Sequence, residues 1–144
     1  MEKLNGIELV VIEDDPNDVE LIRRALKKHN IVNDIKVLSD GAEALDYLLP
    51  NGKALDDIRK FIFLDLKLPK VNGIEVLEKI KINEALKRVP VVILSSSREN
   101  PDIKKCYALG ANSYLVKPVI FEKFIEVVAE AGMYWLILNE SPKD

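Results

Sequence analysis

Short β-type runs of apolar residues alternate with amphipathic helical stretches along the chain, and this alternation constrains its fold more than any other feature. The predicted strands are residues 7–12, 35–38, 61–64, 91–94 and 113–116. The predicted helices follow these strands and begin near residues 15, 40, 74, 100 and 119. Such an order of elements is typical of a parallel sheet covered by helices. Short connections favour right-handed crossovers in an open, doubly wound α/β sheet.

Particular residues predict where the helices begin and which faces they bury. Asp15-Pro16 and Asn100-Pro101 each combine a capping side chain with the fixed φ of proline. Asp40 is predicted to cap the second helix, and Asn72-Gly73 to make a turn before the third. Helical spacing predicts the buried residues Val19, Ile22, Ala25, Leu26, Ala44, Leu45, Leu48, Val76, Leu77 and Ile80.

Length and charge favour one domain that spans residues 1–144, with a final helix over about residues 119–138. The net charge of −3, without a dense Lys/Arg stripe, disfavours direct binding of nucleic acid. No apolar run is long enough to span a bilayer, and the first residues resemble no targeting signal, so we expect a cytoplasmic protein. Cys106, the single cysteine, is expected to be buried, and His29 to be exposed or capping a helix.

Polar side chains follow four of the five predicted strands. In an open α/β sheet the site lies beyond the carboxyl ends of the strands, where the strand order reverses. The residues at these ends are Glu13, Asp14 and Asp15, then Asp65, then Ser95 to Ser97, and finally Lys117. The sequence therefore places acids, hydroxyls and one amine at a single edge.

These residue types match the requirements of phosphoryl transfer to a carboxylate. Crowded carboxylates repel one another unless a cation offsets their charge, and oxygen ligands without histidine or thiol favour Mg²⁺. Asp65, at the tip of a buried apolar strand, is suited to act as the nucleophile. Ser95 and Lys117 would contact phosphoryl oxygens, because this reaction asks mainly for positioning and charge neutralisation.

Four motifs contain these strand-end residues: Val-Ile-Glu-Asp-Asp-Pro, Phe-Leu-Asp-Leu-Lys-Leu-Pro with Asn-Gly following, Val-Val-Ile-Leu-Ser-Ser-Ser and Gly-Ala-Asn-Ser-Tyr-Leu-Val-Lys-Pro. Through these motifs the chain resembles the receiver domains of two-component response regulators. The resemblance covers nearly the whole chain. It implies a flavodoxin-like (βα)5 fold with five parallel strands in the order 2-1-3-4-5.

The resemblance also implies a role for each matching residue. Asp65 is the phosphoacceptor, and Asp14 and Asp65 bind Mg²⁺ directly, with Lys67 adding its backbone carbonyl. Glu13, where aspartate is commoner, completes the acidic pair, and Lys117 precedes a peptide bond that is usually cis. Ser95, where threonine is commoner, supplies the switch hydroxyl, and the aromatic ring of the switch falls on Tyr114.

The resemblance implies a signalling switch and not a conventional enzyme. A sensor histidine kinase would supply the phosphoryl group, and the output would be a contact with an effector protein or with a second copy of the chain. The apolar end of the last helix predicts a homodimer, with Tyr134, Trp135 and Leu138 as candidate contacts. The Glu-Asp-Asp-Pro and Tyr-Trp-Leu segments are similar to single-domain regulators that serve phytochrome-type kinases.

Three other interpretations remain open. A haloacid-dehalogenase-type phosphatase also uses a strand-terminal aspartate, Mg²⁺ and a lysine, but needs a second acid where this chain has Lys67. A flavodoxin-like binding module would need a phosphate loop after the first strand. A receiver that has lost phosphorylation would act by docking alone. Each residue also has a structural alternative: a salt bridge for Lys117, a turn hydroxyl for Ser95 and a half-buried strand aromatic for Tyr114.

Overall fold

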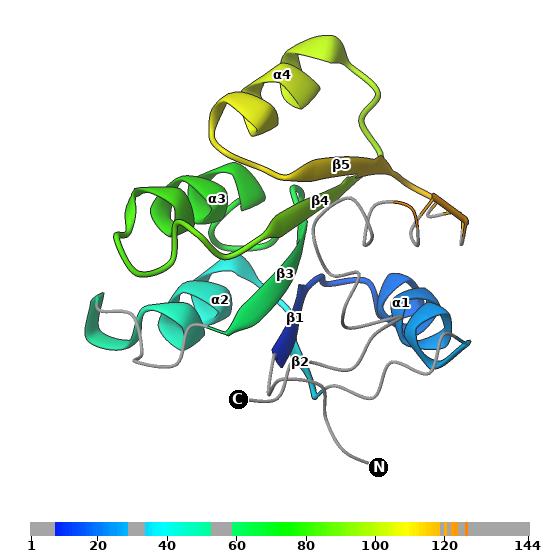
Figure 1. The fold of residues 1–144 in the computed structure, drawn as a ribbon, viewed down its shortest axis with the longest axis horizontal. Coiled ribbons are helices and arrows are strands. Elements are labelled where there is room, and N and C mark those ends of the chain that lie inside the picture. The colour runs from blue at the N-terminus through cyan, green and yellow to red at the C-terminus, as the bar shows by residue number, and fades with distance from the viewer. Residues whose placement is uncertain are drawn as a thin grey trace, which may run out of the picture.

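Five parallel strands form one sheet in the order β2-β1-β3-β4-β5 (Figure 1). The computed structural model of this chain describes residues 8–28, 34–52 and 59–118, together with residues 120, 122, 123 and 126. The strands are β1 (Glu8–Ile12), β2 (Ile35–Leu38), β3 (Lys60–Asp65), β4 (Val91–Ser95) and β5 (Ser113–Val116). Both the doubly wound class and the strand order agree with the sequence-based prediction.

Helices cover both faces of this sheet. They are α1 (Pro16–Lys28), α2 (Gly41–Leu48), α3 (Gly73–Ile82) and α4 (Asn100–Ala108), and a short 3-10 turn, η1 (Pro50–Gly52), follows α2. Helix α1 lies on one face of the sheet, and α2 and α3 lie on the other (Figure 1). Among the described residues, no helix combines the length and the apolar character that crossing a membrane requires.

The central strands β1, β3 and β4 are buried on both faces, as their continuous apolar sequences predict. Alternate side chains of these strands join α2, α3 and the buried Cys106 of α4 in one apolar cluster. The same four residues of α1 that helical spacing predicts are buried on the other face. The prediction is also correct for α3 and for most of α2, where only Leu45 is partly exposed.

The helix starts confirm two of the predicted caps and correct two details. Asp15 accepts a hydrogen bond from the Asn17 N–H at 2.8 Å, and Asp40 accepts one from the Glu43 N–H at 2.7 Å. Asn72 is itself the cap of α3, accepting from the Glu75 N–H at 3.0 Å, so it does not belong to a separate turn. Helix α4 already begins at Asn100, and the residue at its cap, Glu99, makes no side-chain capping bond. A proline at the first turn therefore starts α4 without the predicted asparagine cap.

Several predictions fall outside the described residues. They concern His29, most of the last helix and the candidate dimer contacts Tyr134, Trp135 and Leu138.

Candidate functional site

The parallel register brings four polar strand ends to the same edge of the sheet. Ile12 of β1 aligns with Leu64 of β3, so Glu13 and Asp65 occupy equivalent positions on neighbouring strands. In the same way Ser95, the last residue of β4, aligns with Val116 of β5, and Lys117 follows at once. The edge that the sequence predicted as the site therefore holds all four side chains.

Three carboxylates form a cluster at this edge. One carboxylate oxygen from each of Glu13, Asp14 and Asp65 lies within 4.8 Å of the other two. Glu13 and Asp65 are buried, whereas Asp14 is exposed. Asp15, which the sequence also placed at this strand end, caps α1 instead. Oxygen ligands alone make up the cluster, and this donor set fits a hard divalent cation such as Mg²⁺.

Burial makes this cluster unfavourable for negative charge. Burial is the largest of several influences that together raise the pKa of Glu13 to about 7, and the nearby charge of Asp65 acts in the same direction. Hydrogen bonds from Lys117 and from the Asp15 N–H act in the opposite direction but do not cancel the effect of burial. A cation placed among these oxygens would remove the electrostatic cost that holds this pKa high.

Lys117 reaches into the cluster from the end of β5. Its Nζ lies 2.8 Å from Glu13 Oε2, 2.9 Å from Asp18 Oδ2 and 3.3 Å from Asp65 Oδ2. Burial alone would lower the pKa of Lys117, but hydrogen bonds to Glu13 and Asp18 and the charges of Asp65 and Glu13 raise it overall. The ammonium group therefore stays charged next to the proposed nucleophile.

The backbone around Lys117 is fixed by two features. Its N–H donates to the Ser95 carbonyl at 2.8 Å, which ties the end of β5 to the end of β4. The peptide bond between Lys117 and Pro118 is cis, as the resemblance to receiver domains implied.

The loop after Asp65 packs tightly against the end of β3. The Lys67 N–H donates to Asp65 Oδ1 at 3.2 Å, and the Gly73 N–H donates to the Leu66 carbonyl at 2.9 Å. A Cβ added at Gly73 would lie 2.3 Å from the Asp65 carbonyl oxygen, so only glycine allows this close approach. The loop thus contacts the proposed phosphoacceptor at both its side chain and its backbone carbonyl.

A chain of hydrogen bonds links the site to Tyr114. The buried Ser95 hydroxyl accepts from the Ser97 N–H at 3.1 Å, which is also the geometry of an ordinary serine turn. The Ser97 carbonyl in turn accepts from the Tyr114 hydroxyl at 3.0 Å. Ser97 Oγ donates to Asp102 Oδ2 at 2.5 Å, which joins the same loop to the first turn of α4.

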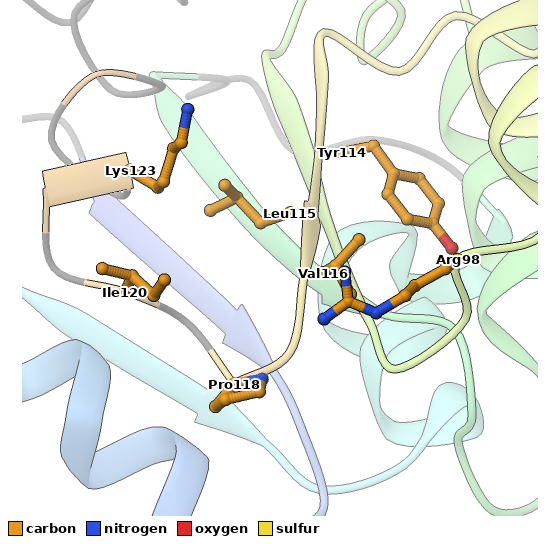
Figure 2. A pocket seen from close by; sticks show the side chains of 7 residues that line it. All are labelled: Arg98, Tyr114, Leu115, Val116, Pro118, Ile120 and Lys123. Carbon is orange, nitrogen blue, oxygen red and sulfur yellow. The ribbon is translucent and has the colours of Figure 1, made fainter.

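Tyr114 also borders a surface hollow of about 420 Å³ next to β5. Figure 2 shows Tyr114 and Arg98 toward one end of this hollow and Ile120 and Lys123 toward the other. Leu115, Val116 and Pro118 complete its lining. A change in the Tyr114 ring would therefore alter the shape of this surface.

Among the described residues that contact Lys117, Asp18 is the one that the sequence did not predict as part of the site. It lies in the first turn of α1, where an acid is expected simply because it suits a helix N-terminus. Its contact with a lysine ninety-nine positions later in the chain leaves no local signal in the sequence.

A known protein family matches most of the length of this chain. The family model described as the response regulator receiver domain matches residues 9–129. The probable methanogenesis regulatory protein FilR2 of Methanothrix harundinacea is 40% identical over 134 residues, covering 93% of this chain and 86% of FilR2. The response regulator Rcp1 of Synechocystis is 36% identical over 129 residues, covering 89% of this chain and 88% of Rcp1.

Three solved structures resemble this one closely. The bacteriophytochrome response regulator RtBRR has a TM-score of 0.78 and 44% identity, covering 94% of this chain and 83% of RtBRR. The Mn²⁺-bound form of Rcp1 has a TM-score of 0.73 and 33% identity, with 94% and 99% covered. The phosphorylated cyanobacterial phytochrome response regulator RcpA has a TM-score of 0.74 and 32% identity, with 98% of each chain covered.

Proposed function

Because this chain belongs to the response regulator receiver family of two-component systems, we propose that it is a signalling switch that accepts a phosphoryl group on Asp65. The observation that carries this proposal is the acid cluster of Glu13, Asp14 and Asp65 with Lys117 beside it. A solved relative in its phosphorylated form and another with Mn²⁺ bound support the same chemistry here. A sensor histidine kinase is the proposed donor.

Asp14, Asp65 and the backbone carbonyl of Lys67 would hold Mg²⁺, with Glu13 binding directly or through water. When bound, the cation would neutralise charge on the carboxylates and on the incoming phosphoryl oxygens. An Asp65 carboxylate oxygen attacks phosphorus, and the bond from phosphorus to the donor's imidazole nitrogen breaks, leaving the electron pair on nitrogen. Lys117 and Ser95 then contact the phosphoryl oxygens.

The switch would run from the phosphoryl group to Tyr114 through the loop after β4. Movement of the Ser95 hydroxyl toward the new oxygens would break its bond with the Ser97 N–H, which is 3.1 Å long before phosphorylation. Because the Ser97 carbonyl also holds the Tyr114 hydroxyl, the ring and the loop would shift together. Phosphate favours the new packing only to the extent that it interacts more strongly with that state.

The output would be a protein contact at the surface around Tyr114, whose hollow the moving ring would reshape. A homodimer that uses Tyr134, Trp135 and Leu138 remains part of this proposal. The name of FilR2 refers to regulation of methanogenesis and that of RtBRR to a bacteriophytochrome, so we propose only the class of input partner for this chain, a sensor kinase.

Incubation with a small phosphodonor and Mg²⁺, followed by intact mass measurement, tests this function. The wild type should gain one phosphoryl group, and Asp65→Asn should gain none. Asp46→Asn removes an exposed acid from α2 and serves as the matched control, which should be modified like the wild type. Equal modification of Asp65→Asn would show that Asp65 is not the acceptor. Continuous release of phosphate from a simple ester would support the phosphatase interpretation instead.

A further inference from the structure

Lys117 is shared between the acid cluster and a carboxylate outside it. Its two shortest contacts are those to Glu13, at 2.8 Å, and Asp18, at 2.9 Å, while Asp65 is more distant at 3.3 Å. Glu13 and Asp65 both belong to the cluster that fits a cation, but Asp18 does not. Lys117 can therefore pair with Asp18 without occupying a carboxylate that the cation would use as a ligand.

The position of Asp18 is fixed by the start of α1. Its backbone N–H donates to the Asp15 carbonyl at 3.1 Å, and Asp15 in turn caps the helix through the Asn17 N–H. A carboxylate in the first turn is also favoured by the helix dipole. Only 20% of the Asp18 side chain is exposed, so its carboxylate is held in place at the start of α1, where it contacts Lys117.

The same ammonium group competes with a cation for the cluster. A lysine that moved fully between Glu13 and Asp65 would neutralise the charges on which Mg²⁺ binding depends. An ammonium group has three N–H donors, and in this structure one of them is directed to Asp18. That bond draws the ammonium toward α1 while leaving it within reach of Asp65.

We infer that Asp18 is a positioning residue that holds Lys117 beside the acid cluster, so that the carboxylates stay available to Mg²⁺. The inference rests on the proposed function of the site, because it assigns Asp18 to the binding step that precedes phosphoryl transfer. Without Asp18 the ammonium would turn toward Glu13 and Asp65 and compete with the cation.

Calorimetric titration of the full chain with Mg²⁺ measures this effect directly. Asp18→Asn should weaken Mg²⁺ binding by about tenfold, the size expected when a group that orients a metal site is lost. Asp18→Glu keeps the charge and should bind Mg²⁺ within about twofold of the wild type. Glu20→Gln removes an exposed acid of the same helix that pairs with Arg24, and it should also stay within about twofold. Thermal melts show that each variant is folded.

The same Asp18→Asn substitution in a Lys117→Met variant shows whether Asp18 affects Mg²⁺ binding through Lys117 or only through its own negative charge. Lys117→Met removes the competing ammonium, so this variant should bind Mg²⁺ at least as tightly as the wild type. Adding Asp18→Asn to Lys117→Met should then change the Mg²⁺ dissociation constant by less than about twofold. Equal weakening by Asp18→Asn in both backgrounds would overturn the inference.

Phosphoryl uptake as a function of Mg²⁺ concentration supplies an independent readout. Asp18→Asn should need more Mg²⁺ for half of the maximal rate but reach the wild-type rate when Mg²⁺ saturates. A lower rate at saturation would place Asp18 in the transfer step and contradict the inference. If even the wild type takes up no phosphate, the proposed function fails, while the calorimetric comparison still decides the role of Asp18.

Discussion

Replacing Asp14 by asparagine should stabilise the fold when no cation is present and destabilise it when Mg²⁺ is present. Asp14 is exposed, and its carboxylate lies within 4.8 Å of oxygens of both Glu13 and Asp65. Among the described contacts, Lys117 pairs with those two acids but not with Asp14. The substitution therefore removes repulsion without breaking an ion pair in the described part of the chain.

Coulomb's law gives the size of the effect. Two unit charges 4.8 Å apart repel by about 0.9 kcal/mol in water and by about 3.5 kcal/mol at an effective dielectric constant of about 20. Because Asp14 is exposed, the lower value applies to each of its two neighbours, and the charge of Lys117 offsets part of the sum. We expect a gain of about 1 kcal/mol in the free energy of unfolding, or about 2–4 °C in melting temperature.

Mg²⁺ should reverse the order of the two proteins. At ten times the dissociation constant a bound ion stabilises the wild type by about 1.4 kcal/mol, a gain that Asp14→Asn should lose for the most part. Urea unfolding at about pH 8, where Glu13 is largely ionised, would be compared in EDTA and in Mg²⁺. Asp46→Asn should follow the wild type in both buffers. An Asp14→Asn protein that is less stable in EDTA, or that Mg²⁺ stabilises as much as the wild type, would refute the electrostatic account.

Three further substitutions test other contacts of the fold. Gly41→Ala would place a Cβ 1.8 Å from the Val71 carbonyl oxygen, so thermal or urea unfolding should show a loss of at least about 2 kcal/mol. Burial and the hydrogen bond to Glu8 raise the pKa of Tyr47 to about 12. The folded state therefore favours the protonated phenol, and the wild type should lose stability as the pH rises from about 10 to about 12, whereas Tyr47→Phe should lack this loss. Tyr114→Phe removes the bond to the Ser97 carbonyl and should cost about 1 kcal/mol in urea, and an unchanged midpoint would show that this bond contributes nothing.

The sequence predicted the sheet and the edge that carries the site because both depend on local patterns. Continuous apolar runs mark the central strands, and the residue after each run is automatically at the carboxyl edge. The sequence alone therefore predicts that Asp65, Ser95 and Lys117 lie together, and their chemical roles are part of the proposed function. The helix starts were harder to predict, since the cap was expected at Asn100 and a turn at Asn72, whereas only Asn72 makes a capping bond.

Contacts between distant side chains could not be predicted in the same way. Asp18 looks like any acid in a first helical turn, and its bond to Lys117 depends on how α1 packs beside the end of β5. Likewise Tyr47 donates to Glu8, with its hydroxyl 2.6 Å from Oε1, and Lys60 Nζ lies 2.9 Å from the same carboxylate. These contacts join β1, α2 and β3, and the spacing of the three residues in the sequence does not predict them.

The most direct test of the central claim is to find the residue that carries the phosphoryl group. Reduction of the phosphorylated chain with borohydride converts an aspartyl phosphate to homoserine, and peptide mass mapping then locates the modified residue. We expect homoserine at position 65 alone, formed when both phosphodonor and Mg²⁺ were present. Modification at position 13 or 14, or an equal yield at position 65 in EDTA, would contradict the account of a cation-assisted attack by Asp65.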